Sequence, residues 1–129
     1  RAQYVEAKSY LATSRRTKAF EILAKLSSAT KTPEGAEAAY MIIQDKYDQG
    51  KFQDVENLVY KFSDSGTDQT YWLAKAFIAL GDSFAERGDH KQAKATFESI
   101  RDGYTPSGKT DDVLDNVSMR LEKLEKMGE

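Results

Sequence analysis

The sequence feature that most constrains the fold is an internal repeat of apolar residues at helical spacing. Small or aliphatic residues at Ala7, Ile43 and Gly81 begin three copies that lie 36 and 38 residues apart. In each copy, small or apolar residues follow 12, 16 and 19 residues after the first. They are Ala19, Val55 and Ala93, then Leu23, Val59 and Phe97, then Leu26, Phe62 and Ile100. A period of this length predicts an array of helical units, because each unit buries its apolar face only against its neighbours.

Apolar residues recur at helical spacing along the whole chain, and no segment alternates in the manner of a strand. The spacing predicts seven helices, at about 2–13, 14–28, 33–49, 52–62, 68–87, 90–102 and 110–127. The fifth is apolar almost all round, which predicts a central position. Pro33 falls in a first turn, Gly50 and Gly88 stand where helices end in a left-handed residue, and Asp89 with Gln92 is spaced as a capping box. The chain is therefore predicted to be all-α.

Composition excludes several classes of function. The 129 residues include no cysteine and one histidine, His90, which excludes disulfide frameworks, zinc–thiolate sites and multi-histidine metal sites. Lys and Arg number 19 against 21 Asp and Glu, a balance that argues against a nucleic-acid partner. No stretch reaches the roughly 20 consecutive apolar residues of a membrane span, so we expect no membrane insertion by this segment. We predict neither a cofactor nor a bound metal.

Residues 74–107 carry small and aromatic residues at the spacing of a known repeat. These residues are Leu80 and Gly81 with Phe84 in the first helix, Ala93 and Phe97 in the second, and Pro106 after it. The pattern resembles the tetratricopeptide repeat, a helix–turn–helix unit of about 34 residues. Gly81 and Ala93 are small where the two helices of one unit would approach closely. The middle copy departs from the pattern, because Ile43 and Val55 occupy its two small-residue positions.

The resemblance covers about residues 2–107 and implies one domain over 1–129, an α–α superhelix of three helix pairs with a C-terminal capping helix. The pairs are expected at about 1–31, 36–69 and 74–107, and the capping helix at about 110–127. Residues 71–100 also resemble the C-terminal part of large bacterial cell-envelope proteins with this repeat, which implies a periplasmic or outer-membrane-associated location. Because the chain begins with Arg1 rather than Met, we expect a longer parent protein whose upstream repeats would pack against it.

The same resemblance places one face of each first helix along a concave groove that binds a peptide or a partner protein. The residues in this register are Tyr4, Lys8 and Leu11, then Tyr40, Gln44 and Tyr47, then Lys75, Ile78 and Asp82. Tyr4, Tyr40 and Ile78 are equivalent and would form a ladder along the groove. Tyrosine suits a binding surface because it offers a large area with a polar tip. The alternative is that these tyrosines pack between repeats.

One segment near the C-terminus fits the phosphate-loop pattern G-x-x-x-x-G-K-[ST], with Gly103, Gly108, Lys109 and Thr110 at the fixed positions. A phosphate-binding loop must leave a strand and enter a helix, whereas residues 91–101 have helical spacing. We therefore interpret the segment as a loop between helices, in which Thr110 caps the last helix.

The sequence predicts a non-catalytic module for protein–protein interaction or scaffolding, because no set of residues suited to catalysis is visible. Two alternatives stay open. The first is a purely architectural segment at the C-terminal end of a longer solenoid. The second is a nucleotide-binding protein that uses the loop at 103–110.

Overall fold

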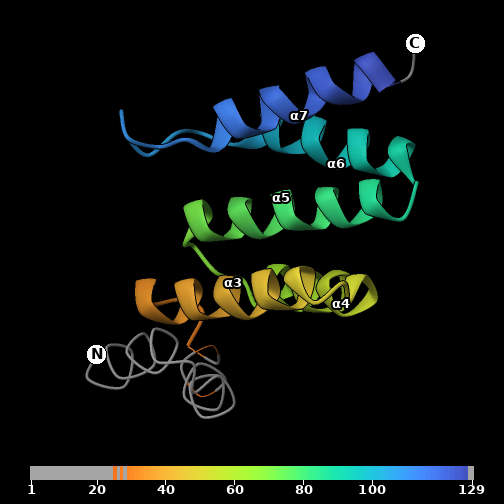
Figure 1. Cartoon of the computed structure of the whole chain (residues 1–129). Helices are drawn as coiled ribbons and strands as arrows, with labels where there is room; N and C mark the ends of the chain where they lie inside the picture. The colour runs from red at the N-terminus through yellow and green to blue at the C-terminus, as the bar shows by residue number, and fades with distance from the viewer. Residues whose placement is uncertain (1–24, 26, 28, 128–129) are drawn as a thin grey trace.

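The structure, a computed structural model, describes residues 25, 27 and 29–127. This part of the chain contains five α-helices and no strand, which confirms the all-α prediction. The helices are α3 (Pro33–Asp48), α4 (Phe52–Asp64), α5 (Thr70–Glu86), α6 (His90–Gly103) and α7 (Val113–Met127) (Figure 1). The helix predicted at 2–13, and the one predicted at 14–28 apart from Lys25 and Ser27, lie outside the described residues.

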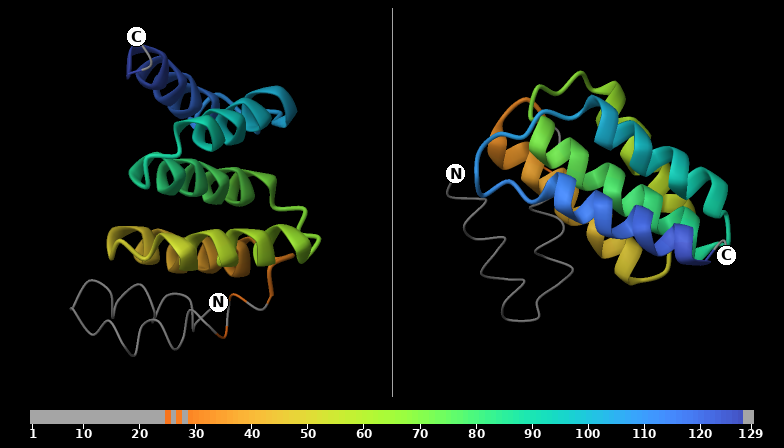
Figure 2. Two further views of the ribbon diagram at one scale, coloured as in Figure 1. Left: turned by 90° about the vertical axis from the view of Figure 1, so that its right-hand side faces the viewer. Right: turned by 90° about the horizontal axis from the view of Figure 1, so that it is seen from above.

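The helices are stacked in layers (Figures 1 and 2). α3 and α4 lie side by side as one layer, α5 lies on that layer, and α6 and α7 lie beyond α5. α5 packs against each of the other four described helices, which confirms the central position that its sequence predicts. The apolar core runs through the whole stack. Residues no more than 2% exposed come from every helix: Ile43, Val59, Leu80, Phe97 and Val117.

The helix ends follow local signals in the sequence. Thr32 precedes α3, and its hydroxyl accepts a hydrogen bond from a backbone N–H of the first turn, 3.0 Å away. The carboxylate of Asp89 accepts the N–H of Gln92 in the same way at the start of α6, at 3.1 Å. Gly50 and Gly88 have φ angles of 73° and 79°, a region that residues with side chains rarely adopt. The predicted turns after α3 and α5 are therefore present.

α5 and α6 approach each other closely at Gly81, as the small residue predicts. A β-carbon on Gly81 would lie 2.7 Å from Cζ of Phe97, closer than carbon atoms approach in folded proteins. The Phe97 ring on α6 therefore fills the space over Gly81, and only 1% of this residue is exposed. Ala93, the other predicted small residue, is fully buried. These residues set the spacing between the two helices.

The last helix begins later than the sequence predicts. We expected it to begin at Thr110, with that residue as its cap, but α7 begins at Val113. The Asp111 carboxylate accepts the N–H of Val113 at 3.0 Å, and the Asp112 carbonyl accepts the first backbone bond of the helix, also at 3.0 Å. Two consecutive aspartates therefore accept two of the backbone N–H groups near the start of α7, and Thr110 stays in the loop. α6 also continues to Gly103, where we expected the loop to begin.

Candidate binding groove

Three helices contribute side chains to one small pocket of about 80 Å³. Its lining residues are Tyr40 and Gln44 from α3, Lys75, Ile78, Ala79 and Asp82 from α5, and Asn116 and Arg120 from α7. Five of these residues belong to the groove that the sequence predicts, so the structure brings those five together. We call this site the polar pocket, after the amide and charged groups that dominate it.

The contribution of α7 to the polar pocket was not predicted from the sequence. Arg120 lies 38 residues after Asp82, and Asp82 lies 38 residues after Gln44. The same interval links Asn116 to Ile78. Continuing the repeat interval into the last helix would therefore have found both residues. α7, which we expected only to cap the array, extends the register of α3 and α5 along the pocket.

An ion pair joins α5 to α7 at the polar pocket. The guanidinium of Arg120 donates from Nε to Oδ1 of Asp82 at 2.8 Å and from Nη2 to Oδ2 at 3.1 Å. Nη1 of Arg120 also donates to the carbonyl of Asn116 at 3.1 Å, which holds the side chain along its own helix. Two parallel bonds fix the geometry more tightly than one. The pair therefore links α7 to α5 at the groove.

Aromatic rings surround Lys75 at one end of the polar pocket. Nζ of Lys75 lies 5.7 Å from the ring centroid of Tyr40 and 5.6 Å from that of Tyr71, within the range of cation–π attraction. Trp72 packs against both tyrosines, with ring centroids 5.7 and 5.0 Å apart. Burial, followed by the charge of Asp48, raises the pKa of Tyr40; burial, followed by the charge of Asp112, raises that of Tyr71. Both hydroxyls therefore keep their protons at neutral pH.

A second and larger pocket of about 480 Å³ adjoins the polar pocket. Its lining residues are Tyr47, Asp82, Ala85, Glu86, Phe97, Met119, Arg120, Lys123, Leu124 and Met127. Asp82 and Arg120 line both pockets, so their ion pair forms the wall between them. We call this second site the methionine pocket, and the two pockets together the groove.

Most of the predicted groove residues can be placed. Tyr47 lines the methionine pocket, where burial, followed by the charges of Asp82 and Glu86, raises its pKa. The first-repeat residues Tyr4, Lys8 and Leu11 lie outside the described residues.

The phosphate-loop match forms a loop that follows a helix, because α6 continues to Gly103. The Asp111 carboxylate accepts hydrogen bonds from the N–H and hydroxyl of Ser107, both at 2.9 Å, and from the hydroxyl of Tyr104. A carboxylate therefore takes a backbone N–H that a phosphate group would need. Burial raises the Asp111 pKa, but hydrogen bonds, first among them the Ser107 N–H, outweigh it and lower that pKa to about 2. Burial and the hydrogen bond to Asp111 raise the pKa of Tyr104 to about 12.

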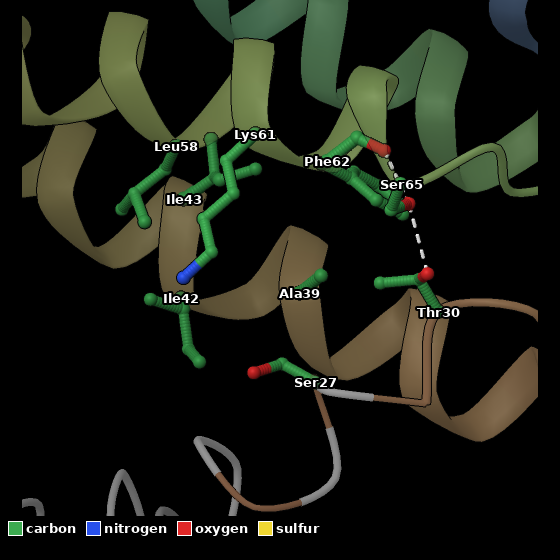
Figure 3. A pocket seen from close by; sticks show the side chains of 9 residues that line it. All are labelled: Ser27, Thr30, Ala39, Ile42, Ile43, Leu58, Lys61, Phe62 and Ser65. Atoms are coloured by element: carbon green, nitrogen blue, oxygen red, sulfur yellow. Dashed lines mark hydrogen bonds between the residues drawn. The ribbon is translucent and has the colours of Figure 1, made fainter.

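A third pocket, of about 350 Å³, lies on the face of the α3–α4 layer that points away from α5 (Figure 3). Apolar side chains form its walls: Ala39, Ile42, Ile43, Leu58 and Phe62. The side chain of Lys61 extends across it, and Ser27, Thr30 and Ser65 form a polar edge (Figure 3). The hydroxyl of Thr30 donates to that of Ser65 at 2.8 Å, which ties the chain before α3 to the end of α4. We call this site the layer pocket.

In the described part of the chain, no group of three or more His, Asp or Glu side chains is placed to hold a metal ion. None of the described helices combines the length and the apolar character that a membrane crossing requires. Comparisons with protein-family models, with curated proteins and with solved structures gave no match.

Proposed function

We propose that this chain is a helical repeat module of the tetratricopeptide type, and that it binds a peptide or a segment of a partner protein in the groove without catalysing a reaction. The observation that carries the proposal is the register of the groove. Residues 38 apart on α3, α5 and α7, such as Gln44, Asp82 and Arg120, line one pocket. A repeating surface of this kind suits an extended or helical segment that runs across successive helices.

The side chains of the groove have the chemistry of a binding surface. Tyr40, Tyr47 and Lys75 are partly exposed, so each offers apolar area together with a polar group. Gln44 and Asn116 add amide groups that both donate and accept hydrogen bonds. Such a surface favours recognition of a peptide backbone and its side chains.

A charge change in the polar pocket tests this proposal. The groove variant is Gln44→Arg with Lys75→Glu, and its matched control is Gln53→Arg with Lys91→Glu on exposed positions of α4 and α6. Each is used to recover partners from extracts, and recovered proteins are then titrated in purified form. We expect the groove variant to weaken binding of a specific partner by about tenfold or more, because charge mismatch at an interface costs affinity. The control should bind as the unchanged chain does.

Circular dichroism and thermal unfolding of both variants would establish that each is folded. A purified partner that binds the groove variant and the unchanged chain equally would contradict the proposal. The cell-envelope origin, proposed from the sequence resemblance alone, is tested by fractionating cells that make the protein. Recovery from the cytoplasmic fraction alone would contradict that origin.

The layer pocket favours a second candidate function, a purely architectural role. Its apolar walls lie on an outer face of the described stack, where a neighbouring helix pair of a solenoid would pack. In this candidate the α3–α4 layer serves as a junction within a longer array, and the groove binds nothing by itself.

The substitution Ile42→Glu tests the architectural candidate, with Gln53→Glu on exposed α4 as its control. If another part of the protein covers the layer pocket, the new charge becomes buried without a partner and lowers the melting temperature by several degrees. Equal melting temperatures for the two variants would contradict this candidate.

A further inference from the structure

The layer pocket lies where the chain enters the described structure. Ser27 and Thr30 stand at its edge, so the residues just before α3 already belong to the pocket (Figure 3). Lys25, two residues before Ser27, has a helical backbone, as the sequence predicts for residues 14–28. The walls of the pocket are apolar, and apolar groups gathered in this way mark a site of association. The preceding residues of the same chain are therefore the nearest candidates to cover it.

Three hydrogen bonds hold the chain at the edge of the layer pocket. The Thr30 hydroxyl donates to that of Ser65 at 2.8 Å, and the Thr67 hydroxyl donates to the Thr30 carbonyl. The side-chain amide of Gln69 donates to the carbonyl of Lys31 at 3.4 Å. All three partners lie between α4 and α5. The point from which the preceding segment leaves the described structure is therefore fixed beside the pocket.

The described helices show how a second helix of the repeat meets the next unit. α4 packs against α5, and α6 packs against α7. One repeat earlier, the same relation places residues 14–28 against α3. α3 supplies Ala39, Ile42 and Ile43 to the layer pocket, on the face that points away from α5. The repeat therefore predicts a helix at this face.

The register of the repeat identifies the face of that helix which would be covered. Ala19 and Leu23 lie 36 residues before Val55 and Val59, which are fully buried on α4. The residues 38 positions later again, on α6, are also buried. Ala19 and Leu23 stand four residues apart, so they share one face of a helix. An apolar face and an apolar hollow are thus supplied by neighbouring parts of one chain.

The short connection favours this segment over any separate molecule. Leu23 stands only seven residues before the anchored Thr30. A segment tethered by so few residues has an effective concentration of the order of mM at the pocket, well above that of a free partner.

We propose that residues 14–28 of this chain fill the layer pocket, with the face that carries Ala19 and Leu23 packed against Ile42. The proposal goes beyond the architectural candidate, which leaves the neighbour of the α3–α4 layer unnamed. A further helix pair or a partner protein would then meet residues 2–13 in place of the layer pocket.

Single cysteines in the full chain test the inference, because the chain has none of its own. Ile42→Cys reports on the layer pocket, Gln53→Cys on exposed α4 is the open reference, and Ser83→Cys reports on the core of α5. The rate of modification by N-ethylmaleimide is followed by mass spectrometry. Each reporter is then combined with Leu23→Asp, or with the control Thr17→Asp, which falls on the opposite face of the same predicted helix.

We expect the thiol of Ile42→Cys to react at least about tenfold more slowly than that of Gln53→Cys, because a covered thiol reacts only when its cover opens. Leu23→Asp should raise that rate at least about fivefold, because an unpaired carboxylate is costly to bury against apolar walls. Thr17→Asp should leave the rate unchanged, and Ser83→Cys should stay protected in both variants. The milder Leu23→Ala should raise the rate about twofold, and it decides the outcome if Leu23→Asp also exposes Ser83→Cys.

Three results would overturn the inference. Equal rates for Ile42→Cys and Gln53→Cys would mean that the pocket is open. Protection of Ile42→Cys that survives both substitutions of Leu23 would mean that another group covers it. Protection that grows with protein concentration would mean that a second copy of the chain covers it.

The inference rests on the helical repeat in the proposed function, but not on binding in the groove. None of the substituted side chains lines the polar pocket or the methionine pocket. Any of the three results above, with binding still weakened by the groove variant, would overturn the inference alone. A partner that binds the groove variant normally would overturn the proposed binding, whatever the thiol rates are.

Discussion

α5 and α7 both contribute residues, 38 positions apart, to the polar pocket, yet their other faces differ. On α5, Leu80 and Gly81 are buried, and Gly81 lies against Phe97 of α6. The residues 38 positions later on α7 are Ser118 and Met119, and both are exposed. Within the described structure no helix covers that face of α7. The comparison teaches that a shared 38-residue interval can bring two helices to one pocket, while the burial of their other side chains depends on whether a further helix packs on them.

The largest loss of stability that follows from this comparison is expected at Phe97, which covers Gly81 from α6. Phe97→Ala should lower the free energy of unfolding by about 3–5 kcal/mol, because it leaves a cavity in the core between α5 and α6. Met119→Ala, at the equivalent face of α7, should change it by less than about 0.5 kcal/mol. Urea unfolding followed by circular dichroism measures both. Similar losses in the two variants would break the comparison.

A smaller loss of stability is expected from substitution of Gly81 itself. Gly81→Ala should cost about 1–3 kcal/mol, because the new methyl group meets the buried Phe97 ring. Gly103→Ala is the matched control, since nothing lies within 4 Å of a β-carbon there. The control should be neutral or slightly stabilising, because alanine favours a helix. If Gly81→Ala behaved like its control under the same urea titration, the close approach of α5 and α6 would be refuted.

Acid should destabilise the loop between α6 and α7, which Asp111 holds by hydrogen bonds. The loss of stability should be smaller than that from substitution of Phe97 or Gly81. The pKa of Asp111 is lowered from 3.8 to about 2, so its contribution to stability is complete above about pH 4 and is lost as pH falls toward 2. Asp111→Asn should remove this part of the acid dependence, while Asp115→Asn on exposed α7 should keep it. Thermal unfolding between about pH 5 and pH 2 measures the difference. Parallel curves for the three proteins would contradict the prediction.

The ion pair between α5 and α7 should contribute less than the core contacts. A double-mutant cycle with Asp82→Asn and Arg120→Gln should give a coupling energy of about 0.2–1 kcal/mol, because both side chains are partly exposed to water. The same cycle in about 1 M salt should give a smaller value. A coupling indistinguishable from zero at low salt would mean that α7 is held by apolar packing alone.

The loop that fits the phosphate-binding pattern is predicted to show no nucleotide binding. We expect no saturable heat on titration with Mg-ATP, for the unchanged chain or for Lys109→Ala, because the loop follows a helix and Asp111 takes its Ser107 N–H. Saturable binding that Lys109→Ala abolishes would support the nucleotide-binding alternative instead.

The helices and turns could largely be predicted because their causes are local. Apolar spacing placed α3 to α6, and Gly50, Gly88 and Asp89 marked their ends. The start of α7 could not be placed in the same way. Thr110 and Asp111 are both plausible caps by residue type, and the choice depends on which side chain reaches a free N–H in the folded loop. The structure shows that Asp111 does.

The residues of the groove also differ in whether the sequence could predict them. The register of the repeat predicted Tyr40, Gln44, Lys75, Ile78 and Asp82 as groove residues, and the structure places them around one pocket. Sequence spacing did not indicate that Arg120 would pair with Asp82. The methionine pocket was missed for the same reason, because exposure of Met119 and Met127 depends on what packs on α7.

The sequence by itself determined that the chain is helical, where its described helices lie to within a few residues, and that Gly81 must face a close neighbour. These properties depend on contacts between residues near one another in the chain or on one repeated interval. Only the tertiary structure decided that α7 forms a wall of the groove and that Asp82 and Arg120 divide it into two pockets. Those contacts join residues on different helices, and their geometry is set when α5, α6 and α7 pack together.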